Sequence, residues 1–122
     1  MDLAEIKPIE KRHDVRHPGT LEPTGMILVL ACTHDEAVKR KVREVNDQIV
    51  KAGKDMSEDK ERELDAALVA AYIVDVEFTG DATWKGETPK YSDKLAREIC
   101  SIQSLKEQVM QEVRSVRDFY KA

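Results

Sequence analysis

Aromatic residues are scarce in this chain of 122 residues, which has one Trp, two Phe and three Tyr. The cores of β-sandwiches rely on aromatic and β-branched side chains, so this scarcity argues against a β-sandwich. It predicts a core built from Val, Leu, Ile and Ala. Glycine is also sparse, and Gly19 and Gly25 stand in a Pro-containing loop that no Lys-Ser or Lys-Thr follows. A phosphate-binding loop is therefore not expected.

Cysteine is nearly absent as well. Only Cys32 and Cys100 are present, far apart and outside any Cys-x-x-Cys pair. Neither lies in the sequence context of a catalytic nucleophile, so we expect no enzyme activity from them. Two buried free thiols in a reducing compartment are the favoured interpretation, and a disulfide is the alternative.

Histidine is limited to His13, His17 and His34, and their spacing is not that of a transition-metal site. His13 and His17 would align only on a helix, which Pro18 opposes. We therefore expect no metal and no cofactor.

No hydrophobic run is long enough to span a bilayer, and residues 1–8 have neither the basic nor the apolar region of a signal peptide. The 20 basic and 24 acidic residues are interspersed, so no strong field attracts nucleic acid or anionic lipid. The chain is long enough for one compact core. We expect a single cytoplasmic domain that spans residues 1–122 and has no membrane partner.

The most informative segment is the polar stretch 12–25, which runs directly into the apolar run 26–32. Its Pro-Gly and Pro-Thr-Gly turns predict a long-looped β-hairpin over residues 11–31, with strands near 11–16 and 26–31. An isolated hairpin is marginal in water, so helices or another chain must cover the apolar strand. Residues 1–10 are expected to form a flexible arm that orders only against the body or a partner.

Helical patterns fill the remainder, residues 33–122. A Thr-His-Asp-Glu capping box that begins at Thr33 predicts a helix over 34–52, and a Ser-Leu-Lys-Glu box that begins at Ser104 predicts one over 104–120. Apolar residues recur on one face of each predicted helix.

A further helix start at Ser57 predicts a helix that runs to about residue 77. The β-branched residues within 73–78 make a strand there the competing prediction. A short helix is expected over 92–100. The predicted fold is thus mainly α: one small domain of three main helices and one short helix, with an N-terminal β-hairpin.

A basic cluster at residues 39–43 could contact phosphate, which would suit a small nucleic-acid-binding regulator. Asp35 and Glu36 stand four residues before Lys39 and Arg40, the favourable order for ion pairs on a helix surface. A solvated helix face is therefore the favoured interpretation, and nucleic acid is not the expected partner.

Hydrophobic surface that one small domain does not bury completely is the remaining functional signal. The apolar strand, the last helix and the loop around the single Trp are the places where we expect protein contacts. The candidate residues are Met26, Leu28, Val29, Leu30, Trp84, Met110, Phe119 and Tyr120. That all of them are ordinary core residues remains the alternative.

Several short motifs follow one another along the chain. The segment His-Pro-Gly-Thr-Leu-Glu-Pro-Thr-Gly at 17–25 precedes an apolar strand, a charged helix that begins with acidic residues, and a long helix. Then come a Trp-Lys-Gly element at 84–86, a Pro-Lys-Tyr-Ser turn at 89–92 and a C-terminal helix that ends in Phe119. This layout, which covers most of the chain, resembles that of the tail assembly chaperones of long-tailed (siphovirus-type) bacteriophages.

The resemblance implies a small, mostly helical, non-enzymatic factor in the cytoplasm of the bacterial host. Such proteins coat the tape measure protein, help tail tube subunits polymerise around it and are absent from the mature virion. The tape measure protein is thus the implied partner, and the major tail protein is a second candidate. Many members are made in two lengths through a ribosomal frameshift. The resemblance transfers no functional residue to this chain.

A chaperone for a long, aggregation-prone partner needs aliphatic surface rimmed by charge, and self-association would line that partner with many copies. We therefore expect a homo-oligomer. Two other functions remain open: a structural neck or head–tail adaptor protein, which would stay in the virion, and the nucleic-acid-binding regulator.

Overall fold

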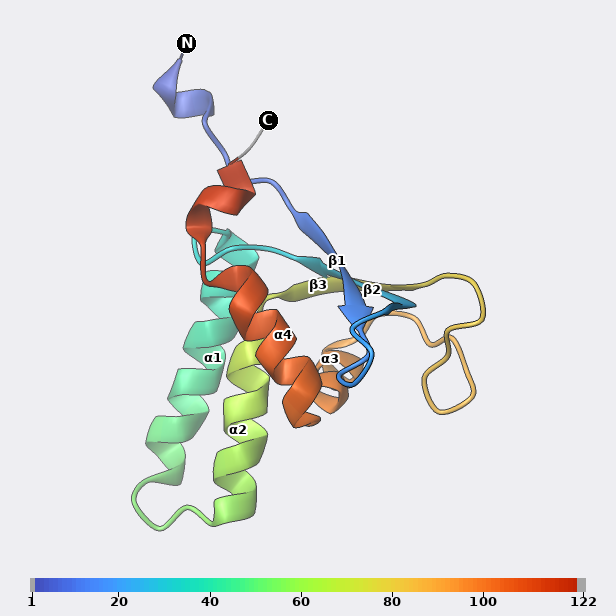
Figure 1. Ribbon diagram of the computed structural model, residues 1–122. Coiled ribbons are helices and arrows are strands. Elements are labelled where there is room, and N and C mark those ends of the chain that lie inside the picture. The colour runs from blue at the N-terminus through green and yellow to red at the C-terminus, as the bar shows by residue number, and fades with distance from the viewer. Residues whose placement is uncertain (1, 121–122) are drawn as a thin grey trace.

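The computed structural model describes residues 2–120 and shows an antiparallel three-stranded sheet with helices packed against one of its faces (Figure 1). The strands are β1 (Lys11–Arg16), β2 (Pro23–Leu30) and β3 (Ile73–Phe78), in the spatial order β1-β2-β3. The β1–β2 hairpin lies where the turn residues predict it. The sheet has a third strand, however, so the fold is α+β and the prediction of a mainly α fold is wrong.

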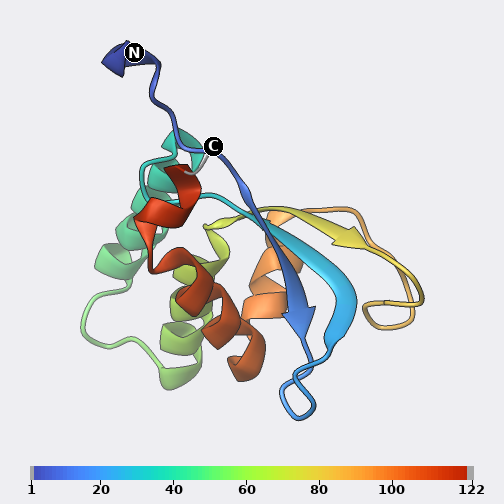
Figure 2. The same cartoon turned by 45° about the horizontal axis from the view of Figure 1, so that its top comes forward.

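Four α-helices and two short 3₁₀ segments complete the described part of the chain. They are η1 (Leu3–Glu5), α1 (Glu36–Ala52), α2 (Glu58–Ala70), α3 (Asp93–Cys100), α4 (Gln103–Val113) and η2 (Val116–Tyr120). α1 and α2 form a helical hairpin that extends away from the sheet, while α3 and α4 lie closer beneath it (Figures 1 and 2). Within residues 2–120, no helix lies on the opposite face of the sheet in either view.

The third strand replaces the second half of the helix expected over 57–77. α2 ends at Ala70, and β3 pairs with the free edge of β2, where Leu28 faces Val76 and Met26 faces Phe78. β-Branched side chains lose χ1 freedom in a helix and pack well on a pleated sheet. β2, which lies more than 40 residues earlier in the chain, pairs with residues 73–78 and so makes them a strand rather than the end of a helix.

β2 is the central strand, and both of its faces are covered. Met26, Leu28 and Leu30 alternate toward the helices, with exposed fractions of 6%, 0% and 0%. Val29 points to the opposite face, where Arg12 of β1 and Glu77 of β3 form an ion pair across β2. The long charged side chains of the two outer strands therefore shelter the apolar residues on the face without helices.

The main core lies between the sheet and the helices. It joins Leu28 and Leu30 to Ile99, Val109 and Phe119 from the second half of the chain. A smaller cluster of Val45, Leu64 and Ala67 holds α1 against α2.

The core also contains both cysteines. Cys32 and Cys100 are buried and free, which confirms the prediction from their spacing. Burial raises the pKa of the Cys100 thiol to about 12, so this thiol stays protonated and is a poor nucleophile.

Two of the four helix starts follow the predicted caps. The Ser57 hydroxyl accepts the Lys60 N–H at 3.2 Å, and the Ser92 hydroxyl accepts the Leu95 N–H at 3.0 Å. α1 instead begins after Asp35, whose carboxylate accepts two backbone N–H groups at 2.9 and 3.1 Å. A carboxylate at this position also meets the positive end of the helix dipole, which favours Asp35 over the predicted cap at Thr33.

The last helix differs most from its predicted bounds. α4 begins at Gln103 after Ile102, without a side-chain cap, so the predicted capping box at Ser104 is not formed. It ends at Val113 rather than at residue 120, and the separate turn η2 follows. This break turns Phe119 into the core, where it is fully buried, and contacts distant in sequence override the helical pattern.

Candidate protein-binding surfaces

The structure places most of the predicted contact residues inside the protein. Five of the eight have exposed fractions of 6% or less: Met26, Leu28, Val29, Leu30 and Phe119. The sequence predicted that helices or another chain must cover the apolar strand, and in the structure helices cover one face of β2 while charged side chains of its neighbours cover the other. The folded chain therefore does not present these five residues to a partner.

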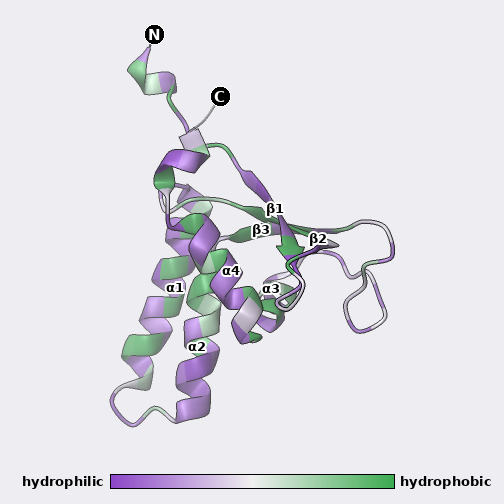
Figure 3. Ribbon diagram, in the orientation of Figure 1, coloured by the Kyte–Doolittle hydropathy of each residue, from purple (hydrophilic) through white to green (hydrophobic). Residues whose placement is uncertain are grey.

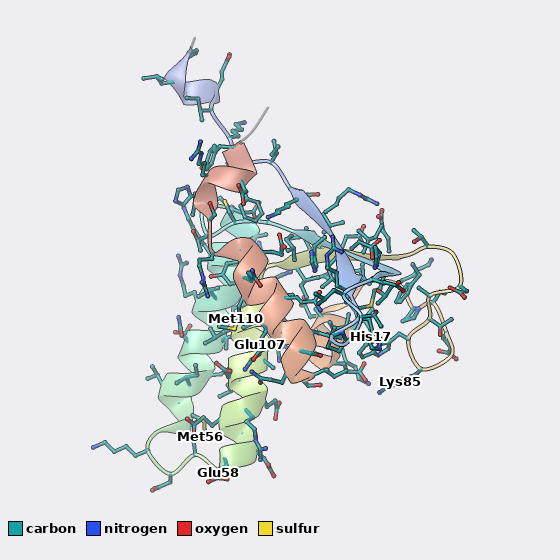
Figure 4. The ribbon with its side chains drawn as sticks, viewed as in Figure 1. His17, Met56, Glu58, Lys85, Glu107 and Met110 are labelled. Atoms are coloured by element: carbon teal, nitrogen blue, oxygen red, sulfur yellow. The ribbon has the colours of Figure 1, made fainter. Side chains whose placement is uncertain are left out.

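The other three predicted residues lie on separate elements. Trp84 is half-buried against the core, in a tight turn closed by two backbone hydrogen bonds with Glu87. Met110 is 46% exposed on α4, the helix that also carries Glu107 (Figure 4). Tyr120 is 37% exposed, and its hydroxyl lies 2.8 Å from the ring of His34. The three residues do not form a common patch.

The motif that carries the family resemblance has a structural role in the β1–β2 loop. The ring nitrogen Nδ1 of His17 accepts the N–H groups of Gly19 and Thr20 at 3.0 and 3.2 Å. Leu21 closes the loop with a φ of 62°, a backbone conformation that residues other than glycine seldom adopt. Its side chain is 64% exposed.

A polar network that the sequence analysis missed holds α4 against the free edge of β1. The Gln108 carbonyl oxygen accepts the Arg16 N–H at 2.9 Å, and the Gln108 amide donates to the Arg16 carbonyl at 2.7 Å. The same oxygen lies 2.9 Å from Nε2 of the buried His13, and Lys11 pairs with Glu112 at 2.6 Å. Gln108 thus bonds to β1 as another strand would, which protects this edge from pairing with other chains.

We predict that Gln108→Ala lowers the free energy of unfolding by about 1–2 kcal/mol, because it leaves polar groups of β1 without their partner. Urea denaturation followed by circular dichroism measures this change. Gln111→Ala removes an exposed amide from the same helix and serves as the control, with an expected change below about 0.5 kcal/mol. Equal losses in the two variants would contradict the role assigned to Gln108.

The predicted basic cluster at 39–43 is divided by the fold. Lys41 turns inward, where its Nζ lies 2.7 Å from the Tyr91 hydroxyl and 3.5 Å from the Asp93 carboxylate. Burial lowers the pKa of Lys41, but the hydrogen bond to Tyr91 and the nearby Asp93 carboxylate outweigh it and leave this pKa raised. Lys39 pairs with Glu36 at 3.4 Å rather than with Asp35, which caps the helix. The cluster therefore does not form one continuous phosphate-binding patch.

The outer side of α1 carries a groove of about 370 Å³. Val38, Val42 and Tyr72 supply its apolar lining, Lys39 and Arg43 supply basic groups, and Asp47 supplies an acidic one. Burial raises the pKa of the Tyr72 hydroxyl, so the groove keeps a neutral phenol at physiological pH. We call this feature the α1 groove.

A second groove, of about 360 Å³, lies between α1 and α2 near the end of the helical hairpin. Ile49, Met56, Leu64 and Leu68 line it, together with the charged residues Lys54, Glu61 and Asp65. Met56 and Glu58 mark this end of the hairpin, which lies far from the sheet (Figure 4). We call this feature the hairpin groove.

The N-terminal arm, residues 2–9, contains none of the predicted contact residues, although an arm that orders against a partner was expected there. Leu3, Ile6 and Ile9 are 75%, 51% and 51% exposed, and the segment projects beyond the rest of the molecule (Figure 3). Their regular spacing of three residues in an otherwise polar segment was the available sequence signal.

Within residues 2–120, His, Cys, Asp and Glu side chains form no group of three or more that is placed to hold a metal ion. No helix in that range combines the length and the apolar character needed to cross a membrane. In comparisons with known proteins, no family model, no curated protein and no solved structure matches the chain.

Proposed function

We propose that this chain is a non-enzymatic tail assembly chaperone of a long-tailed bacteriophage, which binds the tape measure protein and assists polymerisation of the tail tube. It acts in the cytoplasm of the bacterial host and is absent from the mature virion. The major tail protein is a second candidate partner. The observation that supports this proposal most is the α1–α2 hairpin, whose end carries an apolar groove bordered by charged residues.

The hairpin groove suits a helical partner. Amphipathic helices dock by placing an apolar face into a groove, while charged residues around it fix their orientation. Ile49 and Leu68 are only partly buried against the cluster that joins α1 to α2, so a partner side chain could complete their packing. The neighbouring Lys54, Glu61 and Asp65 supply both signs of charge.

Coexpression with the tape measure protein of the same genome tests the proposal. The tape measure protein should co-purify with the chain and stay soluble in its presence. Met56→Asp, in the connection between the helices, should reduce the recovery of the tape measure protein. Val50→Asp is the matched control, because Val50 lies on α1 with 78% of its surface exposed and does not line the hairpin groove.

Failure of the unchanged chain to co-purify with the tape measure protein or to keep it soluble would refute the proposed function. Equal recovery with the two variants would instead move the contact away from the hairpin groove. Mass spectrometry of purified virions provides a second criterion. An assembly chaperone should be missing from the particle, whereas its presence in the particle would indicate a structural neck or head–tail adaptor protein.

A further inference from the structure

The N-terminal arm presents apolar side chains to solvent, and within residues 2–120 its backbone hydrogen bond to the body lies near its base. The Asp2 carboxylate accepts the Ala4 N–H at 3.0 Å and so forms the turn η1, which carries Leu3. At the other end of the arm, the Ile9 N–H donates to the Phe119 carbonyl at 2.7 Å. Between these points the arm extends away from α1 and from the sheet (Figures 1 and 2). Exposed aliphatic groups gathered on such a segment gain free energy when another surface covers them.

The α1 groove has the complementary character. Its volume of about 370 Å³ is large enough for aliphatic side chains. Val42 and Tyr72 are only partly buried and offer apolar contact. Arg43 adds positive charge beside them, Lys39 shares its charge with Glu36, and Asp47 adds one acidic group to the lining. The arm carries two exposed acidic residues, Asp2 and Glu5, and one exposed basic residue, Lys7.

We propose that the arm of one copy of this chain lies in the α1 groove of a second copy. Leu3 and Ile6 contact Val42 and Tyr72 there, and Glu5 lies beside the basic groups. Both elements are present on each copy, so reciprocal exchange gives a closed dimer with two-fold symmetry in which each arm is covered. Two arms acting together also raise the effective concentration of the second contact. This inference concerns the chain alone and does not depend on the proposed phage partner.

Sedimentation velocity of the purified full chain tests the exchange directly. We expect the unchanged chain to form a dimer and Leu3→Ser/Ile6→Ser to weaken dimerisation by about tenfold or more, since two aliphatic contacts are lost. Because these side chains are exposed in the separate copy, the variant should keep the circular dichroism spectrum of the unchanged chain. Val50→Ser removes an exposed aliphatic group from α1 outside the groove and should leave dimerisation unchanged.

Exchanging the charges of Glu5 and Arg43 tests whether the arm lies in the α1 groove. Glu5→Lys and Arg43→Glu should each weaken the dimer, because each places like charges together, and the combined Glu5→Lys/Arg43→Glu variant should restore it. The inference is overturned if the unchanged chain is monomeric up to about 1 mM, if Leu3→Ser/Ile6→Ser still dimerises normally, or if the combined variant does not recover. None of these outcomes bears on recovery of the tape measure protein, which reports separately on the proposed function.

Discussion

Replacing Phe119 with alanine is expected to lower the free energy of unfolding by about 3–5 kcal/mol, because it opens a cavity in the main core. Phe119 has no exposed surface and packs with residues from the sheet and from α3 and α4. It is held in the short turn η2, so few other side chains can move to fill the space. Urea denaturation followed by circular dichroism measures the loss.

Tyr120→Ala is the matched control for Phe119→Ala. Tyr120 is 37% exposed, and its hydroxyl contacts the ring of His34. Loss of that contact should cost about 1 kcal/mol or less. Similar losses in the two variants would mean that η2 as a whole, rather than the Phe119 side chain, stabilises the core. That outcome would contradict the packing described above.

Gly25→Ala is expected to lower the free energy of unfolding by about 3 kcal/mol, through backbone strain and a steric clash together. Gly25 has a φ of 92°, and a Cβ atom there would lie 2.6 Å from the Thr79 carbonyl oxygen. That oxygen belongs to the backbone just after β3, and the Thr79 N–H donates to the Gly25 carbonyl at 2.8 Å. The sheet must therefore shift to admit the methyl group.

Gly80→Ala separates these two causes. Gly80 also has a positive φ, 60°, but a Cβ atom there would meet nothing within 4 Å. Only the backbone strain remains, which costs about 1–2 kcal/mol. Thermal or urea denaturation of the two variants side by side gives the difference. If Gly80→Ala were as damaging as Gly25→Ala, the close approach to Thr79 would not explain the effect.

Features determined by local chemistry could be predicted from the sequence. The turn residues around Pro18 and Pro23 placed the first hairpin, and Ser57 and Ser92 placed two helix starts. Each of these depends on contacts within a few residues, which a linear pattern contains.

Features determined by distant contacts could not be predicted in the same way. Residues 73–78 were predicted to be the end of a helix, with a strand as the competing prediction, and the pairing with β2 makes them a strand. The α+β fold follows from that single pairing. Likewise, the pattern of α4 continues past Val113, but the burial of Phe119 requires a break there.

Hydrophobicity alone does not predict which apolar residues of this chain are exposed. Leu28 and Leu3 are the same residue type, yet one is fully buried and the other is 75% exposed. Leu28 was a predicted contact residue because it lies in a continuous apolar run, which in this fold forms the centre of the sheet. The exposed residues of the arm are isolated among polar neighbours.

The network between α4 and β1 also determines when the outer edge of β1 is covered during synthesis. Lys11 in β1 reaches Glu112, which the ribosome adds 101 residues later. At ordinary elongation rates this interval lasts about 5–20 s. Until Gln108 is in place, the Arg16 N–H and carbonyl at the outer edge of β1 lack their later partner and can pair with other chains. When α4 folds, it covers the outer edge of β1. The last helix therefore limits pairing with other chains during synthesis and also stabilises the finished fold.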